Sequence, residues 1–276
     1  MKTKLPIGIQ VYNLRDLLEN TPENFRSVMQ QVKDLGYEGV ELAGTYGLSP
    51  EEIRDTLREV GLVPVSAHVP FDEMEADIEK VVRDYKTIGC KYIAVPYLPE
   101  ELRPGTEKYA YVLDSIRKFA DYSTAHGLPM LYHNHDFEFY KMPDGEYAFD
   151  YMYRTIPQEI LGVEPDTCWI KVAGEDPAQY LRKYADRCHV IHIKDFYKEG
   201  KTARMYKLLG VEEEETAAAD DGVFEFRPLG EGMQNWEEIL AAAEETAAEW
   251  LIVEQDEHNG IGAIEAARRS MEYLKK

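Results

Sequence analysis

Residues 131–139 place two histidines, an asparagine and two carboxylates directly after an apolar run, in the order Leu-Tyr-His-Asn-His-Asp-Phe-Glu-Phe. A buried strand would have to find a partner for each of these polar groups away from water. At the rim of a cleft, the same groups can bind a metal ion or carry protons. The segment therefore predicts a reactive site, provided that the rest of the chain supplies matching groups.

Matching polar groups stand at the ends of most other apolar runs in the chain. They are Gln10 and Tyr12, Glu41, His68, Glu164 and Asp166, His192 with Lys194 and Asp195, and Glu254 through His258. Random placement of titratable residues would not repeat this position from run to run. The pattern indicates one face where these side chains converge.

Four of these residues form a plausible set of ligands for a divalent cation: His133, Asp166, His192 and Glu254. Imidazoles mixed with carboxylates suit manganese first, and magnesium, cobalt, iron or zinc as well, better than calcium. Each residue alone has a structural alternative, since a histidine can be a hydrogen-bonded core residue and Asp166 can cap a turn. Glu138 competes with His133 as the ligand from this part of the chain.

Lys194 and His135 are candidate proton-transfer groups beside Glu254. In a strand, Lys194 shares a face with His192, because side chains alternate along an extended chain. A lysine in such a pocket could hold a substrate oxygen or, with a lowered pKa, move a proton. The alternative is a lysine whose ammonium reaches the solvent at the rim.

The elements that must position these groups alternate between short β-like runs and longer amphipathic helical patterns. Strands are expected at residues 6–11, 39–42, 63–69, 92–96, 129–133, 160–164, 190–193 and 250–254, and helices at 23–35, 50–60, 72–88, 107–126, 149–155, 177–184, 236–247 and 261–274. Eight such units predict a single α/β domain over residues 1–276, a (β/α)8 TIM barrel whose active site lies at the carboxyl ends of the strands. A doubly wound open sheet is the alternative, but its glycine-rich turn after the first strand is missing.

The regular alternation is interrupted between residues 196 and 232, after the seventh strand. This stretch contains the acidic run at 212–215 and a run of small residues at 216–219. Insertions of this length serve as lids, interface elements or solvated excursions. We expect a lid or an interface element.

Composition limits the partners of the chain. Lys and Arg number 31 against 52 Asp and Glu, which gives a formal net charge of -21 and disfavours nucleic acid. Three scattered cysteines and the absence of a long apolar run indicate a cytoplasmic protein without a membrane partner. A homo-oligomer is compatible with the sequence.

With these strand-end residues, the chain resembles the sugar phosphate isomerase/epimerase family of xylose-isomerase-like barrels, which includes inosose dehydratases and endonuclease IV-like enzymes. The resemblance rests on the order of several motifs: Gly8-Ile9-Gln10-Val11-Tyr12, Gly39-Val40-Glu41, His133-Asn134-His135, His192-Ile193-Lys194-Asp195, Gly230-Glu231-Gly232 and Val253-Glu254. It implies a divalent metal held from the last four strands, with Asp166, His192 and Glu254 among the ligands.

Two departures from the family pattern bear on the reaction. Family epimerases usually have a glutamate at the position of His133 and pair it with the eighth-strand glutamate to move protons on both faces of a sugar. The position of Trp169 is often histidine in the family, and tryptophan there offers a surface for a sugar ring. The resemblance therefore implies a metal ion but leaves open whether the reaction is isomerisation, epimerisation or elimination.

The sequence predicts a metal-dependent isomerase or epimerase that acts on a keto sugar or related polyol through an enediolate. The alternatives are a lyase or dehydratase that eliminates a β-oxygen from a 3-keto sugar or inosose, and a sugar-binding barrel without catalysis; the endonuclease branch conflicts with the acidic charge. The expected catalytic residues are Glu254, Lys194 and His135. The expected substrate-binding residues are Gln10, Tyr12, Glu41, His68, Glu138 and Trp169.

Overall fold

The computed structural model describes residues 2–200 and 222–276. Eight parallel strands form its main sheet: β1 (Ile7–Gln10), β2 (Gly39–Ala43), β3 (Val63–His68), β4 (Ile93–Val95), β5 (Met130–His133), β6 (Leu161–Glu164), β7 (Val190–Ile193) and β10 (Trp250–Val253). They are hydrogen-bonded in the order β6-β5-β4-β3-β2-β1-β10-β7. Bridges from Val163 to Cys188 and from Asp166 to His192 join the two ends, so the barrel is nearly closed. The predicted TIM barrel is confirmed.

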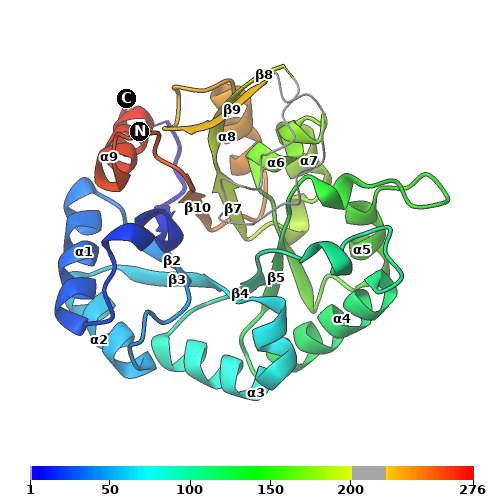
Figure 1. Cartoon of the computed structure of the whole chain (residues 1–276), viewed down its shortest axis with the longest axis horizontal. Helices are drawn as coiled ribbons and strands as arrows, with labels where there is room; N and C mark the ends of the chain where they lie inside the picture. The colour runs from blue at the N-terminus through cyan, green and yellow to red at the C-terminus, as the bar shows by residue number, and fades with distance from the viewer. Residues whose placement is uncertain (1, 201–221) are drawn as a thin grey trace.

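Helices surround the strands (Figure 1). They are α1 (Pro22–Leu35), α2 (Pro50–Val60), α3 (Phe71–Ile88), α4 (Tyr109–Ala125), α5 (Ala148–Thr155), α6 (Thr167–Val172), α7 (Pro177–Lys183), α8 (Trp236–Glu244) and α9 (Ala263–Lys275), with short 3-10 turns at Val11–Leu17, Glu100–Leu102, Phe137–Phe139 and Ala185–Arg187. The local sequence sets their ends: α2 begins with a capping box between Ser49 and Glu52 and ends at Gly61, which has a φ of 80°. None of the helices in the described residues is both long and apolar enough to cross a membrane.

The interior of the barrel begins as an apolar layer. Its buried side chains are Val65, Tyr92, Ala94, Leu131, Val190 and Ile252, which contact one another. Because their strands are not all neighbours, these contacts are possible only inside the barrel. Glycines on adjoining strands make room for them. A Cβ at Gly162 would lie 2.4 Å from Leu131 Cδ2, and one at Gly8 would lie 2.6 Å from Ile252 Cδ1.

A polar layer follows directly above the apolar one. Side chains along a strand return to the same face every second residue. His133 therefore stands two residues beyond Leu131, His192 beyond Val190, and Glu254 beyond Ile252. The strand geometry itself carries these polar groups to the carboxyl end of the barrel, where the active sites of this fold lie.

The insertion after β7 begins and ends as a two-stranded antiparallel hairpin. β8 (Asp195–Glu199) pairs with β9 (Val223–Arg227). The expected excursion from 196 to 232 is therefore partly regular structure, and its central part, including the acidic run, lies outside the described residues. Figure 1 shows the hairpin beside α6 and α8 at the rim of the barrel.

Asp195 fixes the base of this hairpin. Its carboxylate accepts hydrogen bonds from the backbone N–H groups of Gly230, Gly232 and Gln234 and from the indole of Trp236. A Cβ on Gly232 would lie 2.1 Å from Asp195 Oδ1. The Gly230-Glu231-Gly232 motif thus wraps a buried carboxylate and joins the insertion to the barrel.

Candidate active site

The four predicted metal ligands come together at the carboxyl ends of neighbouring strands. One donor atom from each of His133, Asp166, His192 and Glu254 lies within 4.8 Å of the other three, and all four residues are buried. Two imidazoles and two carboxylates at this spacing form a donor set that suits a divalent transition metal or magnesium.

Asp166 combines a structural role with an open donor. It is the N-cap residue of α6, where Oδ1 accepts from the backbone N–H groups of Cys168 and Trp169. Its other oxygen, Oδ2, is buried and has no hydrogen-bond partner in the described part of the chain. It lies 3.7 Å from His133 Nε2. A buried carboxylate oxygen without a partner is costly unless a cation satisfies it, so the site fits a metal ion.

The two histidines differ in their electrostatic surroundings. Burial, together with the nearby His192 and His68, lowers the pKa of His133 well below its ordinary value, so its imidazole is neutral and suited to bind a metal. Burial opposes charge on His192 too, but Glu41, Glu254 and Glu164 outweigh it and raise the pKa of His192 well above its ordinary value. In the absence of a cation, a proton on His192 offsets part of the buried negative charge.

Lys194 reaches into the same polar layer, where three carboxylates lie around its ammonium. Its ammonium donates to Glu254 Oε2 at 3.1 Å, forms an ion pair with Asp256, and lies 3.7 Å from Asp166 Oδ2. Burial disfavours the charged form, but these carboxylates outweigh it and raise the pKa of Lys194 well above its ordinary value. Of the two roles expected for Lys194, holding a substrate oxygen fits these surroundings, whereas moving a proton with a lowered pKa does not, because the neighbouring anions raise the pKa of its ammonium.

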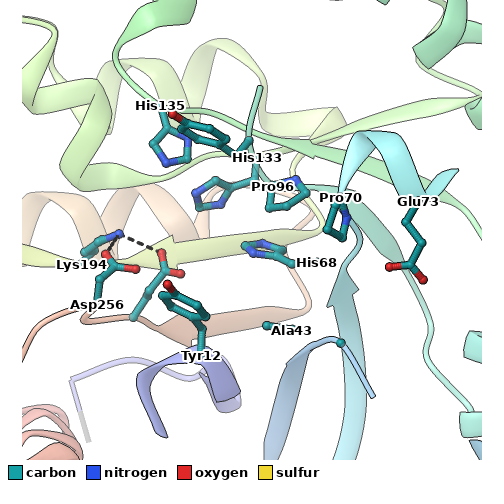
Figure 2. A pocket seen from close by; sticks show the side chains of 13 residues that line it. Tyr12, Ala43, His68, Pro70, Glu73, Pro96, His133, His135, Lys194 and Asp256 are labelled. Carbon is teal, nitrogen blue, oxygen red and sulfur yellow. Dashed lines mark hydrogen bonds and ion pairs between the residues drawn. The ribbon is translucent and has the colours of Figure 1, made fainter. Parts of the chain in front are cut away.

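A cavity of about 360 Å³ opens above this layer. It is lined by Tyr12, Ala43, Gly44, His68, Pro70, Glu73, Pro96, Tyr97, His133, His135, Lys194, Glu254 and Asp256. Figure 2 shows Lys194, Asp256 and Tyr12 on one side of it and His68, Pro70 and Glu73 on the other. Its size suits a small sugar or polyol.

His135 faces this cavity between aromatic rings. Its ring stacks on Phe137 at 5.4 Å between centroids and meets Tyr97 edge-on at 5.2 Å. Burial and then the charge of Lys194 lower the pKa of His135 well below its ordinary value. The imidazole is therefore neutral and can accept a hydrogen bond from a bound molecule.

Two of the expected substrate-binding residues, Tyr12 and His68, line the cavity, whereas Gln10 and Glu41 lie beneath it. Glu41 is completely buried and accepts hydrogen bonds from Gln10 Nε2 at 2.8 Å and Ser66 Oγ at 2.6 Å. Its carboxylate is already engaged by the protein. The expectation that Gln10 and Glu41 contact substrate does not fit this geometry, because the strand stagger sets both one layer too deep.

Glu138 and Trp169 also lie outside the cavity lining. Glu138 is buried and accepts from Tyr132 Oη at 2.5 Å and from the His135 backbone N–H at 2.8 Å, so it braces the loop after β5 and does not compete with His133 for a cation. Trp169 is buried between His135 and the hairpin residue Phe224. The expected sugar platform is covered by aromatic rings, one of them supplied by the insertion.

Two residues that the sequence placed among the strand-end polar groups, without assigning them a role, belong to the cluster. Asp256 lines the cavity and pairs with Lys194. Glu164 joins His68, His133 and His192 in a second group of donor atoms within 4.8 Å. Their positions at strand ends predict that they face the same centre, but only the barrel geometry shows which groups they contact.

The fold and the polar layer agree with a match to a known family. The pattern of the xylose isomerase-like TIM barrel family covers residues 29–276, and the chain belongs to this family. An inosose dehydratase from Clostridium beijerinckii is 23% identical over 98% of this chain and 95% of its own length.

Two solved structures share the fold over nearly the whole chain. A sugar phosphate isomerase/epimerase from Parabacteroides distasonis has a TM-score of 0.76 at 19% identity and covers 98% of this chain and 93% of its own. The probable 3-DHS dehydratase AsbF from Bacillus anthracis has a TM-score of 0.75 at 15% identity, with 99% of each chain covered. The prediction that this chain is an enzyme of the superfamily is confirmed.

Proposed function

We propose that this protein is a divalent-metal-dependent enzyme that removes a proton beside the carbonyl of a neutral polyhydroxy ketone. The observation that carries the proposal is the convergence of His133, Asp166, His192 and Glu254 within 4.8 Å under a cavity of about 360 Å³. A divalent cation held there would polarise the substrate carbonyl and acidify the neighbouring C–H. Manganese suits the donor set best, and magnesium, cobalt, iron and zinc are alternatives.

The residues around the cation position have separate tasks. Glu254 faces the cavity and can accept the proton, whereas the neutral His135 can accept a hydrogen bond from a substrate hydroxyl. Lys194 remains cationic, so it donates hydrogen bonds to an oxygen that gains negative charge or to a departing hydroxyl. Tyr12, Tyr97 and His68 line the remaining walls and position the substrate.

The charges of the cavity support a neutral substrate. Among the described lining residues, Lys194 is the one lysine or arginine, and Asp256 and Glu254 already neutralise it. Glu73 adds a further negative charge at the wall. Apart from the proposed metal ion, a phosphate or carboxylate in this cavity would meet acids and no unengaged cation among the described lining residues, so an unphosphorylated ketose or inosose is favoured.

Elimination of water is the outcome that the site supports best. An epimerase with two carboxylate bases needs one acid on each face of the substrate, and this chain has His133 where such an acid would stand. One proton acceptor together with the cationic Lys194 instead suits removal of a C–H proton and loss of a β-hydroxyl. The similarity to an inosose dehydratase also favours elimination. Isomerisation or epimerisation is the second candidate, and it shares the first proton transfer.

One experiment separates these outcomes. The purified protein is loaded with Mn²⁺ and incubated in D₂O with an inosose and with a panel of ketohexoses. Deuterium uptake beside the carbonyl reports the shared step, loss of water by mass spectrometry reports elimination, and a new stereoisomer reports epimerisation. If neither exchange nor product appears with any substrate, while the protein still binds metal, the proposal is wrong and a barrel without catalysis is favoured.

A further inference from the structure

The two histidines of the proposed metal site stand between two sets of carboxylates. On the cavity side, His192 Nδ1 lies 3.0 Å from Glu254 Oε2, and His133 Nε2 lies 3.7 Å from Asp166 Oδ2. On the inner side, His192 Nε2 lies 2.6 Å from Glu41 Oε2, and His133 Nδ1 lies 3.7 Å from Glu164 Oε2. Each imidazole therefore presents one nitrogen to each set.

The chemistry of imidazole allows only one side of each ring to bind a cation in this arrangement. A neutral imidazole has one acceptor nitrogen and one N–H. A cation on the cavity side takes His192 Nδ1 and His133 Nε2, which leaves both N–H groups pointing at Glu41 and Glu164. A carboxylate behind a metal-binding histidine fixes its tautomer and its orientation.

Glu41 and Glu164, the inner carboxylates, are held in place in a way that suits orienting the two histidines. Glu41 is held by Gln10 and Ser66, and His68 Nε2 lies 3.1 Å from Glu41 Oε2 and 2.9 Å from Glu164 Oε2. Both glutamates are completely buried and neither lines the cavity. Glu164 Oε1 and His133 Nδ1 have no hydrogen-bond partner among the described residues. A small rotation of the His133 ring toward Glu164 would give the N–H at Nδ1 a hydrogen-bond acceptor.

We propose that Glu41 and Glu164 are positioning residues that hold His192 and His133 in the tautomers that turn Nδ1 and Nε2 toward a single cation. This inference rests on the proposed metal-dependent function. It also explains two fully buried acids that touch neither the cavity nor the solvent. His68 links the two glutamates and keeps them on the same side of the rings.

The test uses Zn²⁺ alone as the probe, because it is diamagnetic and its binding needs no substrate. Affinity is measured by competition with a chromophoric chelator for the full-length wild type, Glu41→Gln and Glu164→Gln. Glutamine can donate as well as accept, so it releases the tautomer preference that a carboxylate imposes. Each variant should bind zinc roughly 10- to 100-fold more weakly than the wild type. Glu138→Gln is the matched control, since Glu138 is equally buried and faces neither histidine.

A second readout separates positioning from a loss of charge or of packing. Long-range ¹H–¹⁵N spectra of the zinc-loaded wild type should show His192 protonated at Nε2 and bound through Nδ1, with a strongly hydrogen-bonded N–H proton. That proton should shift upfield in Glu41→Gln and stay in place in Glu138→Gln.

Three results would overturn the inference in distinguishable ways. If the wild type binds no zinc, the metal site itself is wrong, and the proposed function with it. If the wild type binds one zinc but Glu41→Gln and Glu164→Gln match the control in affinity and spectrum, only the positioning role is wrong. If the wild type binds a second zinc that Glu164→Gln loses, the inner set is a ligand set in its own right and the positioning role is again wrong.

Discussion

Glu138 makes the folded protein less stable as pH rises, and Glu138→Gln should remove this effect. Burial raises the pKa of Glu138 from 4.5 to about 8, against the opposing hydrogen bonds from Tyr132 and the His135 backbone. The folded chain therefore keeps this proton at neutral pH, whereas the unfolded chain loses it above pH 4.5. The stability that Glu138 contributes is fully present below pH 4.5 and is lost as pH rises toward 8.

The size of the effect follows from the shift. Between pH 4.5 and 8 the folded state binds one more proton than the unfolded state, so the free energy of unfolding falls by about 1.4 kcal/mol per pH unit. Over the whole interval of about 3.5 units this amounts to roughly 5 kcal/mol. Glutamine has the shape of the protonated acid: its carbonyl accepts from the His135 N–H, and its amide donates to the hydroxyl of Tyr132.

Urea unfolding of both proteins at pH 5, 6, 7, 8 and 9 measures this difference. The difference in stability between Glu138→Gln and the wild type should move in favour of the variant at each step, and level off above pH 8. Comparing the two proteins cancels the contributions of other titrating groups. A difference that stays constant with pH would show that Glu138 is ionised in the folded state, and the reasoning from burial would fail. A loss of metal binding in the variant would instead indicate that Glu138 is a ligand of the cation.

The other predictions concern the metal layer and the hairpin. Asp166→Ala should lower bound manganese, measured by atomic absorption, and should also lower the free energy of unfolding in urea by about 1 kcal/mol, because one side chain both caps α6 and faces the cation; unchanged metal content would exclude it as a ligand. Lys194→Met should lower kcat by at least about 100-fold in the D₂O assay if its charge stabilises a developing anion; unaltered kcat would leave it only a structural role. Gly232→Ala should lower the free energy of unfolding by about 2–4 kcal/mol, since its Cβ would meet the Asp195 carboxylate. Stability equal to the wild type would show that the hairpin base can shift.

Much of the fold follows from local patterns in the sequence. The helix expected at 50–60 coincides with α2, because Ser49, Glu52 and Gly61 encode both of its ends. All eight barrel strands occur where short apolar runs were expected. The helix expected from 261 begins at Ala263, after Gly262 with a φ of 85°, which the apolar periodicity alone does not reveal.

The site residues that were predicted correctly in position are those whose placement depends only on strand alternation. His133, His192 and Glu254 face inward because each stands two residues beyond an apolar interior side chain. Trp169 could not be placed in this way. Its environment depends on Phe224, which arrives from the far arm of an insertion more than fifty positions along the chain.

The sequence does not reveal how far along the barrel axis an inward-facing side chain lies. Glu41 and Glu254 both end apolar strands and both point inward, yet Glu254 lines the cavity whereas Glu41 is sealed beneath it by His68 and His192. The tilt and stagger of the strands set this height, and they are properties of the closed barrel. The same stagger places two imidazoles between an upper and a lower set of acids. A chain that kept every strand-end residue but altered the stagger would lose the distinction between the acids that face a substrate and the acids that orient the histidines.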